Sequence, residues 1–189
     1  MMLEGDKVIL REKQISDAQD DYRWRSDPEL AELDASRPIN VNFEDFLDSF
    51  SHELDYPSFS SHSFSITTRD GKHIGNCMYY DLNHLKREVE VGIMIGDREY
   101  WNSGYGADAM RTLVDHVFKT VGVQRVYLHT LEWNHRARRS FQKCGFREVR
   151  TVRRGGHVFR LMEITRAEWQ EMHAARSTPQ ITDSGAIST

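Results

Sequence analysis

A glycine-bearing loop at residues 101–107 (WNSGYGA) is the part of the sequence best suited to chemistry. It lies between a predicted strand and a predicted amphipathic helix. Glycine lets the backbone curl, so that successive N–H groups can point into one cavity, and the N-terminus of the following helix adds about half a positive charge. Such an arrangement binds anions, and a diphosphate in particular. We therefore expect a phosphate-bearing ligand at this loop.

Two classes of cofactor could use the loop. Residues 104–109 (GYGADA) satisfy the dinucleotide pattern GxGxxA, and Glu132 closes the next predicted strand, where a ribose-binding acid could lie. However, Glu132 follows Gly104 by 28 positions, where about 20 are usual. Several residues also separate the loop from its strand, and the chain downstream is too short to complete a doubly wound domain. These disagreements weigh against a dinucleotide such as NAD. They favour the second class of cofactor, coenzyme A, which also carries a diphosphate.

The sequence around the loop resembles the GNAT superfamily of N-acetyltransferases. The most specific stretches are residues 88–118 (EVEVGIMIGDREYWNSGYGADAMRTLVDHVF) and 133–146 (WNHRARRSFQKCGF). The pyrophosphate loop of that superfamily is usually R/Q-x-x-G-x-G/A. Trp101 at its first position is common in the branch of the Rim-type ribosomal-protein and spermidine acetyltransferases. The resemblance runs from Leu3 to about Trp169, and YRWRSDP (22–28) and LMEITRAEW (161–169) also look like this branch.

The resemblance implies acetyl-CoA as the acetyl donor, and it implies a set of cofactor-binding residues. Backbone amides of the loop would hold the CoA diphosphate, and the preceding strand would pair with the pantetheine arm. An asparagine that opens the next helix commonly contacts the cofactor, and arginines behind it could neutralise phosphate. These roles map onto Met94, Ile95, Asn102, Ser103, Gly104, Tyr105, Gly106, Ala107, Asn134 and Arg139, with Arg138 as a further candidate.

The resemblance also implies transfer of an acetyl group to a primary amine by direct attack in a ternary complex. An amine with a pKa of about 10.4 is neutral in roughly one molecule in 2,500 at pH 7, so the site needs a proton acceptor. Glu90 is the leading candidate, because alternation places it on one face of the strand that leads to the loop. Glu88 is the second choice, and His129 fits a packing role better than a base.

The proton donor for the leaving thiolate is harder to assign. Many relatives carry a tyrosine where this chain has Phe141, and some carry a serine where it has Ala137. Because a thiol has a pKa of about 8.5, the thiolate can leave without a dedicated acid. The same two residues also suit an alternative interpretation, a catalytically weak acyl-CoA-binding or sensor protein of the same fold.

The hydrophobic pattern predicts one α/β domain over residues 1–176. Strands are expected at 7–13, 63–67, 73–81, 88–95, 124–131, 146–152 and 158–164. Helices are expected at 16–25, at 42 to about 54, after the loop to about 121, and at 134–143. The resemblance makes this a GNAT-like, mostly antiparallel mixed sheet of about seven strands with splayed central strands, flanked by about four helices on both faces. Residues 177–189 lack periodicity and are predicted to be disordered.

Composition narrows the class of protein. The chain has 189 residues, a net charge of −4 and 39% apolar residues, which suits one globular domain. It has no apolar run near the ~20 residues that span a bilayer and no visible secretory signal. Cys77 and Cys144 lack metal-ligand spacing, so neither a metal site nor a disulfide is expected. We therefore expect a cytoplasmic protein without a membrane partner.

Charge is distributed unevenly along the chain. Residues 1–60 hold fifteen acidic and six basic side chains, whereas 134–160 hold nine basic residues and one acidic residue. The basic segment carries no nucleic-acid-binding motif. We expect the acidic part to face a cationic acceptor: a protein N-terminus, a polyamine, an amino sugar or an aminoglycoside. Candidate groove residues are Trp24, Asp34, Tyr79 and Tyr80. A homodimer is possible, since many members of the resembled superfamily are dimers.

Overall fold

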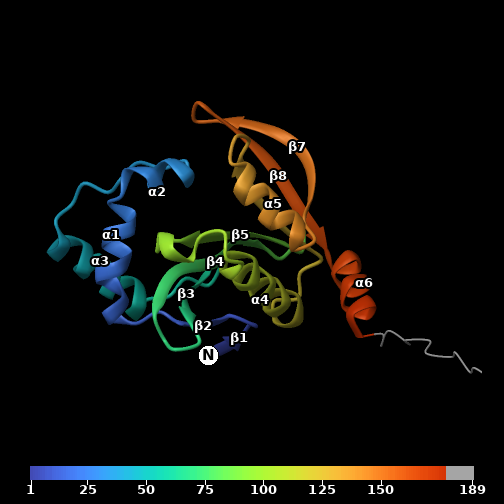
Figure 1. Ribbon diagram of the computed structural model, residues 1–189, viewed down its shortest axis with the longest axis horizontal. Coiled ribbons are helices and arrows are strands. Elements are labelled where there is room, and N and C mark those ends of the chain that lie inside the picture. The colour runs from blue at the N-terminus through green and yellow to red at the C-terminus, as the bar shows by residue number, and fades with distance from the viewer. Residues whose placement is uncertain (178–189) are drawn as a thin grey trace, which may run out of the picture.

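An eight-stranded sheet forms the centre of the computed structural model, which describes residues 1–177 (Figure 1). The strands are ordered β1-β2-β3-β4-β5-β6-β8-β7. They are β1 (Met2–Glu4), β2 (Val8–Glu12), β3 (His62–Thr68), β4 (His73–Asn83), β5 (Glu88–Ile95), β6 (Arg125–Leu131), β7 (Arg147–Arg154) and β8 (His157–Thr165). All neighbouring strands are antiparallel except β5 and β6.

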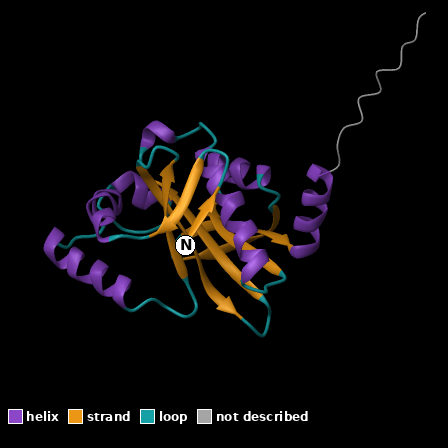
Figure 2. Ribbon diagram, turned by 90° about the horizontal axis from the view of Figure 1, so that it is seen from below, coloured by secondary structure: helices purple, strands orange, loops and turns teal. Residues whose placement is uncertain are grey.

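Helices cover both faces of the sheet (Figure 2). They are α1 (Ala18–Arg25), α2 (Pro28–Leu33), α3 (Phe43–Asp55), α4 (Tyr105–Thr120), α5 (His135–Lys143) and α6 (Arg166–Ser177), with 3-10 turns η1 (Ile15–Asp17) and η2 (Arg98–Tyr100). The predicted α/β class and mostly antiparallel sheet are confirmed, with eight strands and six α-helices within residues 1–177. The predicted disorder at 177–189 lies outside the described residues, except that Ser177 ends α6.

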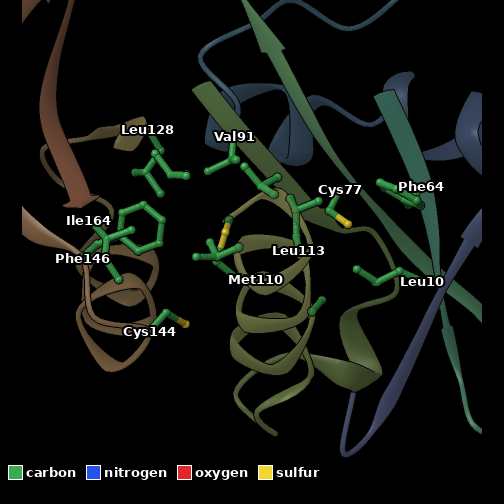
Figure 3. Close-up of a cluster of buried hydrophobic side chains, with 14 of the residues drawn as sticks. Leu10, Phe64, Cys77, Val91, Met110, Leu113, Leu128, Cys144, Phe146 and Ile164 are labelled. Atoms are coloured by element: carbon green, nitrogen blue, oxygen red, sulfur yellow. The ribbon is translucent and has the colours of Figure 1, made fainter. Parts of the chain in front are cut away.

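The main core lies between the sheet and α4 (Figure 3). The apolar face of α4 presents Met110, Leu113 and Val117 to strand residues such as Leu10 and Phe64, all of them buried. A smaller cluster on the other side joins α1 to α3. Asn42 caps α3 as predicted, because its side chain accepts a hydrogen bond from the backbone N–H of Asp45. These two layers fix the sheet on which the candidate residues lie.

The start of the first helix differs from the prediction. The capping box is formed by Gln14 and Asp17, and Gln14 lies two residues before the predicted start of the helix at residue 16. The backbone N–H of Gln14 donates to Asp17 Oδ2 at 2.8 Å. Asp17 takes the capping role because its carboxylate also accepts hydrogen bonds from Arg11 on β2. This partner is not part of the local sequence pattern.

β5 and β6 separate after a short paired segment. Their register pairs join only Glu88–Glu90 to Arg125–Tyr127. Beyond that point β5 stays paired with β4 as far as Ile95, and β6 stays paired with β8 as far as Leu131. The sheet is therefore open between residues 91–95 and residues 128–131, as the predicted splay requires.

Asp108 and Gly96 fix the position of the glycine-bearing loop. The buried carboxylate of Asp108, on the first turn of α4, accepts hydrogen bonds from the backbone N–H groups of Lys7 (2.8 Å) and Val8 (3.1 Å). At the other end of the loop, a Cβ added to Gly96 would lie 2.1 Å from the indole of Trp24. The loop is thus held between β2 and α1.

Other features concern the chain as a whole. Among residues 1–177, none of the helices combines the length and apolar character that crossing a bilayer requires.

Cys77 and Cys144 are both buried thiols. Burial raises the pKa of the Cys77 thiol well above its ordinary value. Thiolate chemistry at this position is therefore disfavoured.

Candidate active site

A cleft of about 390 Å³ lies where β5 and β6 separate. It is bounded by β5, the loop, the first turn of α4, β6, α5 and α2. The predicted residues that line it are Met94, Ile95, Asn102, Gly104, Gly106, Ala107, Asn134 and Arg139, whereas Glu90 is not among the lining residues and lies against one of them, His129. Most of the predicted cofactor set is therefore brought together around one cavity.

The unpaired edge of β5 offers backbone groups to the cleft. The N–H of Gly96 donates to Ile74 O on β4 at 3.0 Å, and the carbonyl of Met94 also faces β4, against Gly75. Because strand residues alternate in the direction of their N–H and C=O groups, those of Ile93 and Ile95 face the cleft. The backbone of Met94 therefore faces β4, and Ile93 and Ile95 are the residues whose backbone groups can pair with a ligand; the predicted cofactor contact of Met94, which lines the cleft, stays a prediction.

The facing edge of β6 can be assigned in the same way. The N–H of Glu132 donates to Val158 O on β8 at 2.9 Å. Alternation then directs the backbone groups of His129 and Leu131 toward the cleft. Two unpaired strand edges therefore face each other, and an extended ligand could hydrogen bond between them as an additional strand.

The loop itself has the predicted curled backbone. Gly104 has φ of +87° and Asn102 has φ of +59°, both in the left-handed region. Gly104 precedes α4 without a side-chain cap, so the first amides of this helix lack an acceptor within it. Ser103 and Tyr105 are not among the cleft-lining residues. The Ser103 hydroxyl donates to Trp101 O, and the Tyr105 ring packs edge-on against Tyr100. Any role of these two residues would be through their backbone.

Trp101 has a structural role that the sequence did not indicate. Its indole Nε1 donates to the carbonyl of Ile95 at 2.7 Å, so it occupies one of the cleft-facing acceptors of β5. The guanidinium of Arg136, from α5, lies 3.8 Å from the centre of the indole ring. Trp101 therefore links β5 to α5 along the wall of the cleft.

α5 contributes both capping and basic residues. The Asn134 side chain accepts a hydrogen bond from the N–H of Ala137 at 3.1 Å, which caps the helix. Arg139 and Lys143 line the cleft. Arg138 instead pairs with Glu148 at 2.7 Å, so it serves the β7 side of the helix. Of the two predicted arginines, the structure brings only Arg139 to the cleft.

The two positions without a proton donor also lie at the cleft. Phe141 and Ala137 both line it, and Phe141 packs against Phe146 with ring centres 6.2 Å apart. Neither side chain can protonate a thiolate. Ser140, on the same helix, is a further lining residue and carries a hydroxyl.

Glu90, His129 and Tyr80 form a polar cluster at the point of separation. Glu90 is 5% exposed, and its Oε1 lies 2.8 Å from Nδ1 of His129. Burial acts to raise the pKa of Glu90, but hydrogen bonds from His129 and Tyr80 outweigh it, and the pKa lies below its usual value. Burial beside this carboxylate raises the pKa of Tyr80 well above its usual value. The cluster therefore holds one carboxylate, one imidazole and one neutral phenol.

The second-choice carboxylate is engaged elsewhere. Glu88 Oε2 lies 2.7 Å from Nη1 of Arg125, whose Nε lies 2.6 Å from Glu163. Glu88 is also absent from the residues that line the cleft. This glutamate therefore belongs to an ion-pair network that joins β5, β6 and β8.

One wall of the cleft is formed partly by α2, which the sequence patterns did not predict. Leu30, Leu33 and Asp34 line it together with Tyr80. The signal that could have revealed α2 is its cap: Asp27 accepts hydrogen bonds from the N–H groups of Glu29 and Leu30, with proline at the first helical position.

Trp24 and Tyr79, two predicted groove residues, are not brought to the cleft. Trp24 is 3% exposed and packs on Gly96. Tyr79 stacks on His62 with ring centres 5.9 Å apart. Alternation explains Tyr79, because its neighbour Tyr80 takes the face that carries Glu90.

The residues present fit coenzyme A. The uncapped amides of α4 and the basic Arg139 and Lys143 suit its phosphates. The facing edges of β5 and β6 suit an extended amide-bearing arm. When bound in acetylated form, this molecule would supply a thioester whose carbonyl carbon accepts a nucleophile.

Comparisons with known proteins agree with this geometry. A model of the acetyltransferase (GNAT) domain matches residues 7–147. The uncharacterized N-acetyltransferase p20 of Bacillus licheniformis is 21% identical over 122 residues, which cover 64% of this chain and 68% of that relative.

Two solved structures share the fold. Spermidine N-acetyltransferase of Vibrio cholerae, in complex with CoA and spermine, has a TM-score of 0.76 at 16% identity, covering 86% of this chain and 98% of that one. Aminoglycoside acetyltransferase AAC(6′)-Ib, in complex with coenzyme A, has a TM-score of 0.73 at 20% identity, covering 88% and 99%.

The domain match spans about three quarters of the sequence and includes β5, the loop and α5. The finer placement in the Rim-type branch stays a prediction. The chain belongs to the GNAT acetyltransferase family and is an acyltransferase that uses acetyl-CoA as its donor.

Proposed function

We propose that the protein transfers an acetyl group from acetyl-CoA to the primary amine of a small cationic molecule. The observation that carries this proposal is the polar cluster of Glu90, His129 and Tyr80, placed where the two unpaired strand edges begin. A carboxylate–imidazole pair at this point can remove a proton from an amine, and the strand edges can hold the donor beside it.

The acceptor end supports a cationic substrate. Asp34 and His129 line the same cleft, with Glu90 hydrogen bonded behind His129, and Leu30 and Leu33 supply apolar surface for a carbon chain. The neighbouring spermidine and aminoglycoside acetyltransferases act on such amines. We therefore place polyamines and aminoglycosides ahead of amino sugars and protein N-termini as acceptors.

The test is an amine screen with the full-length protein and acetyl-CoA, read out by release of free thiol. We expect turnover with at least one polyamine or aminoglycoside and none with matched alcohols that lack an amine. The product would be confirmed by a mass increase of one acetyl group. Thiol release with none of these amines would contradict the proposed acceptor class.

A second candidate function is acyl-CoA binding with weak or no catalysis. Phe141 and Ala137 favour it, because both line the cleft without offering a proton. Binding of acetyl-CoA, measured by calorimetry, without turnover of any amine would support this alternative. Turnover that depends only on which amine is supplied would exclude this alternative, because the protein would then be catalytic.

A further inference from the structure

We propose that His129 takes the proton from the amine and that Glu90 holds its imidazole in place. This inference rests on the proposed acetyl transfer and assigns roles within its site. His129 is 13% exposed at its side chain and lines the cleft, whereas Glu90 lies behind it at 2.8 Å. His129 is then the catalytic residue, and Glu90 is a positioning residue.

The hydrogen bond between the two side chains fixes the tautomer of the imidazole. The pKa of Glu90 lies below its usual value, so its carboxylate is ionised at neutral pH and can only accept hydrogen bonds. Nδ1 of His129, which faces this carboxylate, must therefore carry a proton. In a neutral imidazole the lone pair is then on Nε2.

Nε2 is available to a substrate. Within residues 1–177, no side chain or backbone group is found at hydrogen-bond distance from it, and it is not one of the buried nitrogens that lack a partner. It can therefore be reached from the cleft that His129 lines. The carboxylate of Glu90, by contrast, already accepts hydrogen bonds from His129 and Tyr80.

The basicity of an imidazole compared with that of a carboxylate also favours His129 as the proton acceptor. An ordinary imidazole is about two pKa units more basic than an ordinary glutamate, so it accepts a proton about 100-fold more favourably. The lowered pKa of Glu90 makes its carboxylate a weaker proton acceptor than an ordinary glutamate.

The groups around the imidazole come from five strands. They are Tyr80 on β4, Glu90 on β5, Tyr127 on β6, Arg154 on β7, whose charge acts on Glu90 and Tyr80, and the ring of Phe159 on β8. Glu90 is the acid that faces the imidazole directly.

Protons and electron pairs are both conserved in the proposed reaction. An ammonium substrate gives one proton to Nε2, and the neutral nitrogen attacks the thioester carbonyl carbon. The C–N bond forms, the C–S bond breaks, and the electron pair leaves with sulfur. The second proton lost by nitrogen goes to the thiolate through water, and the imidazolium releases its proton to solvent.

The kinetic experiment compares wild type, H129A, E90Q and the control H157A. His157 is an exposed histidine that also contacts Phe159 but lies outside this cleft. For H129A we expect kcat/KM for the amine to fall about 100-fold or more. Wild type should lose activity toward acid pH, because a protonated imidazole cannot take a proton, whereas H129A should lack this acid limb and should be partly rescued by free imidazole. E90Q should keep an acid limb at lower activity, and H157A should match wild type.

The opposite pattern would overturn the assignment. If Glu90 were the base, E90Q would lose the acid limb, whereas H129A would keep it and would not respond to imidazole.

A measurement independent of turnover separates this inference from the proposed function. ¹⁵N NMR of histidine-labelled protein should show His129 protonated at Nδ1 in wild type, with that preference lost in E90Q. A proton on Nε2 instead would exclude it as the acceptor. If wild type acetylates no amine, the proposed acetyl transfer fails, and the tautomer alone decides whether Nε2 can take a proton.

Discussion

Asp17 is a buried carboxylate that four hydrogen bonds hold in its ionised form. The two guanidinium nitrogens of Arg11 lie 2.7 and 2.6 Å from its oxygens, and Ser65 Oγ and the Gln14 N–H donate at 2.7 and 2.8 Å. Burial acts to raise its pKa, but these hydrogen bonds outweigh it and lower the pKa to about 2. This one side chain joins η1 to β2 and β3.

We predict that Asp17→Asn destabilises the protein by about 2 kcal/mol at pH 7. The contribution of a carboxylate with a lowered pKa is fully present above its unfolded value, near pH 4, and is lost as the pH falls through about 2. The difference between variant and wild type in urea unfolding should therefore shrink from pH 4 downward. Asp20→Asn, a more exposed neighbour, serves as the control. A difference that stays constant with pH would contradict the role of charge.

At the scale of the element, α4 is held by Asp108 as well as by its apolar face. This carboxylate, 3% exposed, accepts from the N–H groups of Lys7 and Val8 and pairs with Arg111. It therefore sets how the first turn of α4, with its uncapped amides, meets β2.

We predict that Asp108→Ala lowers the free energy of unfolding by about 2–3 kcal/mol, because two backbone N–H groups lose their acceptor. It should also weaken acetyl-CoA binding, which calorimetry can measure. Asp48→Ala, on the exposed face of α3, is the matched control. Unchanged stability in the Asp108 variant would mean that water replaces the carboxylate without loss.

The junction between β5 and the loop depends on Gly96. A methyl group there would meet the buried Trp24 ring at 2.1 Å, whereas one at Gly106 would lie 3.4 Å from Ile95. We therefore predict that Gly96→Ala destabilises the fold by about 1–3 kcal/mol and that Gly106→Ala leaves the melting temperature nearly unchanged. Equal melting temperatures for the two variants would show that Trp24 can move aside.

The elements could be predicted where their local pattern is complete. β5 alternates polar and apolar residues over Glu88–Val91 and continues as an apolar run, and it was expected at residues 88–95, as observed. α2 has six residues, too few to show helical periodicity, so only its Asp27–Pro28 cap could have indicated it. Because α2 was not predicted, Leu30 and Leu33 could not be assigned to the cleft.

At the scale of the molecule, charge is separated across the cleft. The acidic segment forms α1, α2 and α3, and the basic segment forms α5 and the β7–β8 hairpin, on different sides in Figure 1. Such fields raise the local concentration of oppositely charged ligands and weaken with ionic strength.

We predict that raising the salt concentration increases KM for both acetyl-CoA and a cationic amine several-fold, with kcat nearly constant. The check is steady-state kinetics over a series of potassium chloride concentrations, with sucrose at equal osmolality as the control. KM values that do not change with salt would contradict electrostatic attraction of the two substrates.

The residues of the site could be predicted more fully than their arrangement. Glu90 and the loop were assigned from alternation and glycine placement; the loop lines the cleft, and Glu90 lies one side chain behind it, against His129. The pairing of Glu90 with His129 could not be predicted, since it depends on the parallel register that sets Glu90 opposite Tyr127. Residues 39 positions apart come together through that register, and no local pattern encodes it.

The bond from Trp101 to Ile95 O acts as an internal stop. One lone pair of the outermost cleft-facing carbonyl of β5 is therefore already used by the protein, which would limit how far a ligand arm could pair along this strand. From there to Glu90 the strand runs five residues, about 17 Å at roughly 3.3 Å each. The indole of Trp101 and the buried carboxylate of Glu90 thus mark the two ends of this span. Donors whose arms are too short or too long for this span would present their reactive carbon out of line with the imidazole.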